Sequence, residues 1–89
     1  MNAVDLQALR KEIDEIDREI VNLYLKRMKT ADIIGAWKRE NGVPVYDPER
    51  ERLLLDKAAE LAGAEHGEGI RALFTLLLAQ SRERQQRNR

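Results

Sequence analysis

One cationic residue interrupts an otherwise apolar helical stripe in this sequence. From Leu6 to Leu23, apolar residues alternate spacings of three and four, and the same register places Arg27 where the next apolar residue would stand. A buried guanidinium costs several kcal/mol unless it is paired. One interpretation is that Arg27 reaches solvent or pairs with a carboxylate of the protein. The other is that it forms an anion site inside a helical bundle, where its planar donors suit the carboxylate of a bound molecule.

Lys38 favours the anion-site interpretation. It follows Arg27 by eleven residues, so the two positions differ by about 20° in azimuth and about 16 Å along a helix axis. Side chains this long can converge on a small molecule, and Ile34 between them is a candidate wall. Considered alone, Lys38 is more typical of a solvated lysine.

Arg10 cannot serve the same small ligand from the same chain. It precedes Arg27 by seventeen residues, which separates the two by about 25 Å and about 100° in azimuth. In an antiparallel helix pair, however, Arg10 of one chain can approach the ligand site of the other. By itself, Arg10 is typical of a surface charge.

Further polar residues stand in the two later helical segments. Asp47 and Glu51 are four residues apart and share a face, although Asp47 also suits an N-cap and Glu51 favours the helix dipole. Arg50 between them is typical of a surface ion pair. Ser81 and Gln85 offer a hydroxyl and an amide at the same spacing, or else mark a fraying helix end.

Three helices must position these residues, and the sequence predicts an all-α domain spanning residues 1–89 with no strand. Asp5 suits the first N-cap, Gly42 and Pro44 end that helix, Pro48 suits the start of the second, and Gly63 ends it. The expected helical ranges are about 5–40, 48–62 and 69–87.

The first helix is too long for its own chain to cover. About 35 residues extend roughly 52 Å, whereas a compact chain of this size has a diameter of roughly 30 Å. We therefore expect a second chain to cover the remainder.

The composition excludes several classes of function. The 89 residues carry 16 basic and 16 acidic side chains, so no general attraction to nucleic acid or membranes is expected. There is no Cys, and the single His66 cannot build a metal site alone. Without a membrane-length apolar run or a signal-peptide core, the sequence predicts a soluble, cytoplasmic, metal-free protein. Nucleic-acid binding is also disfavoured because the tail arginines lack aromatic partners; they are Arg82, Arg84, Arg87 and Arg89.

Taken together, these residues resemble the all-helical class of chorismate mutases over essentially the whole chain. The matching blocks, in order, are Leu9-Arg10-Lys11-Glu12-Ile13 with Asp17, Lys26-Arg27, Ile34-Gly35-Ala36-Trp37-Lys38, Val43–Arg52, Leu73-Phe74, and Ser81 with Gln85. Val43–Arg52 is the most specific block. The separations match the family pattern apart from a shorter linker near Gly63–Gly69.

The resemblance implies an interlocked homodimer of three-helix chains with two shared active sites and no cofactor. It implies conversion of chorismate to prephenate, an intramolecular Claisen rearrangement of phenylalanine and tyrosine biosynthesis. By position, Arg27 and the partner subunit's Arg10 would bind the two carboxylates, with Ser81 assisting. Lys38 and Gln85 would hydrogen-bond the ether oxygen.

The remaining implied roles concern the ring. Glu51, with the backbone around Asp47, would hold the ring hydroxyl, while Ile34 would line the pocket and Arg50 would sit nearby. Such a reaction needs no nucleophile, only selection of the compact conformer and stabilisation of charge on the ether oxygen. Because Gln85 is neutral, activity should not require acidic pH.

Three alternatives stay open at the level of sequence. Isochorismate pyruvate-lyase shares this fold and its cations, but is expected to lack the acid at Glu51. A non-catalytic helical dimerisation module explains Leu6–Leu23 but not Arg27 or Lys38. A regulatory or fused unit, joined to another enzyme of the same pathway, is the third.

Overall fold

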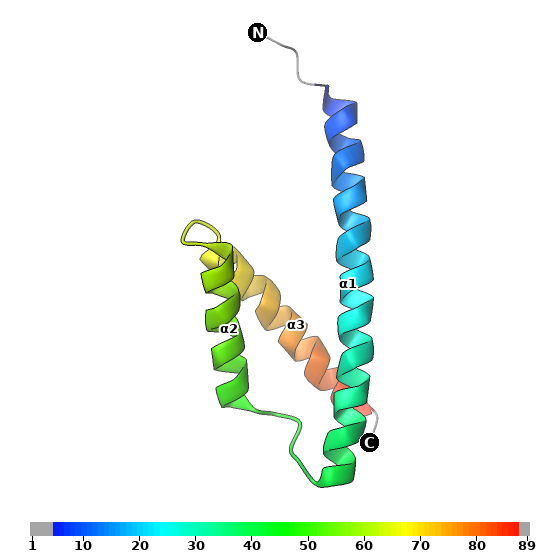
Figure 1. Cartoon of the computed structure of the whole chain (residues 1–89), viewed down its shortest axis with the longest axis vertical. Coiled ribbons are helices and arrows are strands. Elements are labelled where there is room, and N and C mark those ends of the chain that lie inside the picture. Colours follow the sequence, from blue (N-terminus) through cyan, green and yellow to red (C-terminus); the bar gives the residue numbers. More distant parts are fainter. Residues whose placement is uncertain (1–4, 88–89) are drawn as a thin grey trace.

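The computed structural model describes residues 5–87 and consists of three α-helices (Figure 1). They are α1 (Leu6–Asn41), α2 (Pro48–Ala62) and α3 (Gly67–Arg87). No strand occurs within these described residues, and the expected all-α class is confirmed. α3 begins two residues before the expected start, because the turn after Gly63 leads directly into helical hydrogen bonding. Arg89 of the tail lies outside the described residues.

Local capping defines both ends of α1. The Asp5 carboxylate accepts hydrogen bonds from the backbone N–H groups of Gln7 and Ala8 at 3.0 and 3.2 Å, which satisfies donors that have no partner within the helix. At the other end Gly42 adopts the left-handed conformation, with φ of 65°, and its N–H donates to the carbonyl of Lys38. Glycine adopts this conformation without steric cost, so the helix ends there.

The start of α2 is also fixed by residues that are its neighbours in the chain. Asp47 is the N-cap, and its side chain accepts from the backbone N–H of Arg50 at 3.0 Å. Pro48 occupies the first turn, where its missing N–H costs nothing. The six residues from Gly42 to Asp47 connect α1 to α2, and Val45 is buried among them. This connection holds the start of α2 near the end of α1.

α3 joins the other two helices. It packs against both α1 and α2, whereas α1 and α2 make no helix–helix contact of their own within residues 5–87. Figure 1 shows α2 and α3 as a V-shaped hairpin beside the C-terminal half of α1, with the N-terminal half projecting away. The chain measures 62 × 26 × 14 Å, and its radius of gyration is 17.1 Å, well above the roughly 12 Å of a compact chain of this length.

The projecting half of α1 leaves the apolar stripe uncovered. Every residue from Asp5 to Lys26 is exposed, and the side chains from Leu6 to Leu23 that form the stripe are 45–63% exposed. Within residues 5–87, only five apolar residues are buried: Met28, Ala31, Val45, Ala58 and Leu78. A single chain therefore leaves much of its apolar surface in water, which is unfavourable for a short chain without disulfides.

None of the helices in the described range has the length and apolar character that crossing a bilayer demands.

Candidate functional site

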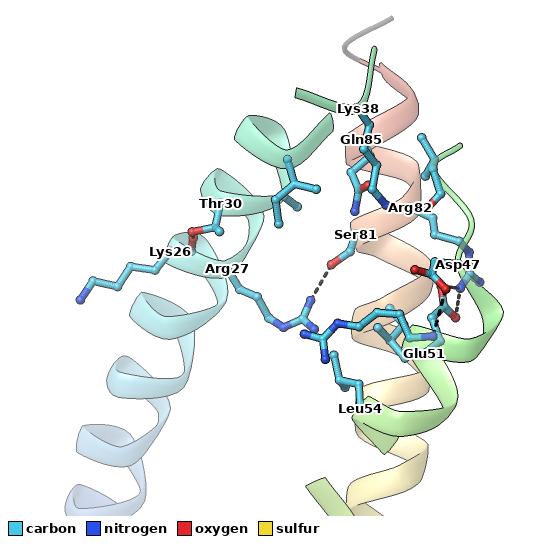
Figure 2. A pocket seen from close by; sticks show the side chains of 15 residues that line it. Lys26, Arg27, Thr30, Lys38, Asp47, Glu51, Leu54, Ser81, Arg82 and Gln85 are labelled. Carbon is cyan, nitrogen blue, oxygen red and sulfur yellow. Dashed lines mark hydrogen bonds and ion pairs between the residues drawn. The ribbon is translucent and has the colours of Figure 1, made fainter. Parts of the chain in front are cut away.

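A cavity of about 630 Å³ lies where the three helices come together (Figure 2). α1 supplies one wall, α3 a second, and the start of α2 with its preceding connection the third. The lining residues are Lys26, Arg27, Thr30, Ala31, Ile34, Lys38, Val45, Asp47, Arg50, Glu51, Leu54, Leu78, Ser81, Arg82 and Gln85.

The cavity gathers all but one of the residues singled out in the sequence. Those that line it are Arg27, Ile34, Lys38, Asp47, Arg50, Glu51, Ser81 and Gln85. Arg10 does not, because it lies on the exposed, projecting half of α1. Within one chain, the site therefore lacks Arg10.

The lining is strongly cationic. Four cationic side chains, Arg27, Lys38, Arg50 and Arg82, and two carboxylates line the cavity, which leaves an excess of two positive charges, while the ammonium of Lys26 points away from it (Figure 2). A chain with no net charge thus concentrates positive potential in this cavity. Such a cleft attracts small anions.

Arg27 is half-buried and points across the cavity from α1 to α3, as Figure 2 shows. Its guanidinium donates to the hydroxyl of Ser81 at 2.5 Å and lies 6.0 Å from the centroid of the Phe74 ring. Burial, and secondarily the positive charge of Arg50, lower the pKa of Arg27. Among residues 5–87, no carboxylate lies within ion-pair distance of Arg27. Of the alternatives drawn from the sequence, an internal carboxylate partner of Arg27 is therefore not found among residues 5–87.

Lys38 and Gln85 lie at the other end of the cavity (Figure 2). The ammonium of Lys38 donates to the carbonyl of Val45 at 2.9 Å, which ties it to the connection before α2. Gln85 is 8% exposed, and its Oε1 atom is buried without a hydrogen-bond partner among the described residues. Buried polar atoms in native proteins nearly always have a partner, so a hydrogen-bond donor, from solvent or from a bound molecule, is expected at this acceptor.

Asp47, Glu51 and Arg82 form the third part of the lining. The Glu51 carboxylate accepts from Arg82 through both oxygens, at 2.5 Å for Oε2. The Arg82 guanidinium also lies 5.3 Å from the centroid of the Tyr46 ring. Asp47 contributes its capping carboxylate beside them.

Arg82 was missed by the sequence analysis, which grouped it with the tail and gave it no aromatic partner. In the structure it lies within α3 and has both an aromatic and a carboxylate partner. A signal was present, since Phe74, Leu78 and Arg82 follow one another at intervals of four on one helix face. Arg82 therefore continues the face of Phe74 and Leu78, as Arg27 continues the apolar stripe of α1.

Contacts between α1 and α3 set the positions of Ser81 and Gln85. The guanidinium of Arg84 donates to the Asp32 carboxylate at 3.0 and 2.6 Å, and this hydrogen-bonded pair raises the pKa of Arg84. The Tyr24 hydroxyl donates to the Gln80 side chain at 2.5 Å. These two cross-links lie outside the cavity and connect α3 to α1. No cluster of three or more metal-ligating side chains occurs among residues 5–87.

Comparisons with known proteins find a matching family model and several similar sequences. A family model described as chorismate mutase type II matches residues 9–86. The chain is 39% identical over 56 residues to the chorismate mutase of Methanocaldococcus jannaschii, an alignment that covers 63% of this chain and 57% of that protein. It is 36% identical over 63 residues to the 4-amino-4-deoxychorismate mutase of Streptomyces venezuelae, covering 71% of this chain and 60% of that protein.

One solved structure is similar over nearly the whole chain. It is a conserved hypothetical protein from Pyrococcus furiosus, with a TM-score of 0.78 and 36% identity, covering 94% of this chain and 99% of that one. The first curated relatives are longer proteins, of which this chain spans between 16% and 57%.

Proposed function

Since this chain belongs to the chorismate mutase type II family, we propose that it converts chorismate to prephenate by an intramolecular Claisen rearrangement, without covalent catalysis or a cofactor. The observation that carries the proposal is the single cationic cavity that collects Arg27, Lys38, Glu51 and Gln85 from three helices. The proposed substrate is a dianion with an ether oxygen and a ring hydroxyl, and these side chains offer a partner to one carboxylate, to the ether oxygen and to the hydroxyl.

Arg27 and Ser81 form the proposed site for one carboxylate. Their hydrogen bond aligns the two donors, and no carboxylate of residues 5–87 competes for the guanidinium. Burial lowers the pKa of Arg27 because the charge is poorly solvated. A bound carboxylate pairs with this poorly solvated charge. Its binding is therefore favoured, because it offsets the cost of burying the guanidinium.

Lys38 and Gln85 are the proposed partners of the ether oxygen. The rearrangement moves negative charge onto this oxygen as its bond to carbon breaks, so donors placed there bind the transition state better than the substrate. Lys38 is held by Val45 and Gln85 by the interior of the α1–α3 contact, which keeps the cost of reorganisation low. An acceleration of about a millionfold needs roughly 8 kcal/mol, to which electrostatics and conformer selection both contribute.

In this proposal the second carboxylate binds Arg10, which the chain does not place in its own cavity. We propose that the protein is a homodimer in which the partner's copy of the first helix covers the exposed stripe and brings its Arg10 to the site. The exposed apolar side chains of α1 and the position of Arg10 on that projecting half support this arrangement. Glu51 and the backbone near Asp47 are left to hold the ring hydroxyl.

The test is proton NMR of chorismate incubated with catalytic amounts of purified protein. Chorismate and prephenate are isomers, so NMR distinguishes them where mass does not. Prephenate signals that appear far faster than in a protein-free control are the expected result. Unchanged chorismate, with release of pyruvate from isochorismate in a parallel sample, would instead assign the chain to the lyase.

A further inference from the structure

Glu51 does not face the cavity alone, because its carboxylate already has a cationic partner on α3. Arg82 donates to both oxygens of that carboxylate. From this pairing we infer that Arg82 is a specificity-determining residue, which makes the Glu51 end of the cavity accept a neutral ring hydroxyl and reject a protonated ring amine. The inference rests on the proposed function and concerns a position at which no substrate contact was expected from the sequence.

A ring hydroxyl and a ring ammonium place different demands on the Glu51 end of the cavity. An ionised carboxylate has about four acceptor positions, so Glu51 can accept from Arg82 and still accept from one hydroxyl. A hydroxyl brings no charge and needs only that acceptor. An ammonium brings a full positive charge, which requires a carboxylate whose own charge is not yet compensated.

Asp47 is the only other acid in the lining, and one of its oxygens is engaged as the cap of α2, where it accepts from the backbone N–H of Arg50. Around this end, the two arginines Arg50 and Arg82 match the two acids Asp47 and Glu51 in number, and the other charged groups that reach the cavity, those of Arg27 and Lys38, are both cationic. A ring amine would therefore enter a region whose potential is already positive.

Arg82 is held in place rather than mobile at the surface. Its side chain is 32% exposed and that of Glu51 is 19% exposed. The guanidinium also lies 5.3 Å from the centroid of the Tyr46 ring, within the range of a cation–π contact. Anchored on two sides, it keeps the Glu51 carboxylate compensated while substrate enters.

The experiment compares kcat/KM for chorismate with kcat/KM for its analogue 4-amino-4-deoxychorismate, in the full chain and in Arg82→Gln. We expect the original chain to prefer the hydroxyl compound, and Arg82→Gln to shift the ratio toward the amine by at least about tenfold, equivalent to about 1.4 kcal/mol. Arg82→Lys retains the positive charge and should retain most of the preference. Arg71→Gln is the matched control, because it removes a positive charge from the same helix that is also paired with a carboxylate, that of Asp56, but lies outside the cavity, and it should leave the ratio unchanged.

The outcomes separate this inference from the proposed function. An original chain that turns over chorismate, together with an Arg82→Gln ratio within about twofold of the original, overturns the role of Arg82 alone. Equal shifts in Arg82→Gln and Arg71→Gln would also overturn it, since they indicate a general electrostatic effect. If neither compound is converted, the proposed function fails, and calorimetric affinities for the two compounds make the same comparison without turnover. An unchanged affinity ratio, or no binding of either compound, then overturns the inference as well.

Discussion

Gly35 and Gln85 are in backbone contact where α1 crosses α3. A Cβ atom placed on Gly35 would lie 2.7 Å from the Cα and 2.9 Å from the carbonyl oxygen of Gln85, closer than real side chains approach a backbone. Gly35 is buried and helical, so a left-handed backbone does not require glycine here. The requirement is the close approach, which sets Gln85 beside Lys38 at one end of the cavity.

We expect Gly35→Ala to push α3 away from α1 and to displace the Gln85 amide. Overpacking of this kind costs about 1–3 kcal/mol of stability, and kcat for chorismate should fall by about tenfold or more with a smaller change in KM. Steady-state kinetics together with thermal unfolding measures both effects. Gly69→Ala is the matched control, since a Cβ there meets nothing within 4 Å.

A double-mutant comparison tests whether Gly35 acts through Gln85. If it does, Gly35→Ala should reduce kcat much less in a Gln85→Ala background than in the original chain, because the displaced amide is already absent. Fully additive losses would show that the two residues affect turnover independently.

Lys38→Ala should nearly abolish turnover while leaving the helical content and the oligomeric state unchanged. The reason is that the ammonium is the only full positive charge proposed for the ether oxygen. Circular dichroism and size-exclusion chromatography supply the structural readouts. Lys29→Ala, an exposed lysine on the same helix that does not line the cavity, is the control. Substantial activity in Lys38→Ala would refute the proposed mechanism.

Mixed dimers test whether Arg10 and Arg27 of different chains serve one site. Arg10→Ala and Arg27→Ala should each be inactive alone, and mixing them should restore part of the activity. In a mixed dimer, one site lacks both arginines while the other retains both. Heterodimer formation is verified by native mass spectrometry with one chain isotopically labelled. No recovery in samples that contain heterodimers would contradict the shared site.

The rate should change little between pH 6 and pH 8. Gln85 does not titrate, and although burial and Arg50 lower the pKa of Arg27, an arginine begins so high that it stays protonated in this range. Gln85→Glu should introduce a pH dependence in which the rate rises as pH falls, because only the protonated carboxyl can donate to the ether oxygen. A flat profile for Gln85→Glu, or a rate in the original chain that collapses across this range, would place Gln85 away from the reacting oxygen.

The sequence by itself determined the features that depend on neighbours in the chain. Asp5 and Asp47 cap helices because their carboxylates reach backbone donors two or three residues onward, and Gly42 ends α1 because it tolerates a left-handed backbone. The interruption of the α1 stripe at Arg27 was visible for the same reason, since helical periodicity alone assigns each residue to a face. These local relations need no knowledge of how the helices pack.

Only the tertiary structure decided which of these faces meet. Arg82 pairs with Glu51 across 31 positions of sequence, and Arg84 with Asp32 across 52, distances over which periodicity carries no information about contact. Which α3 residue lies against Gly35 depends on the rotation and height of that helix, and both follow from packing summed over many side chains. For that reason a residue that was assigned to a polar tail, Arg82, proved to line the cavity.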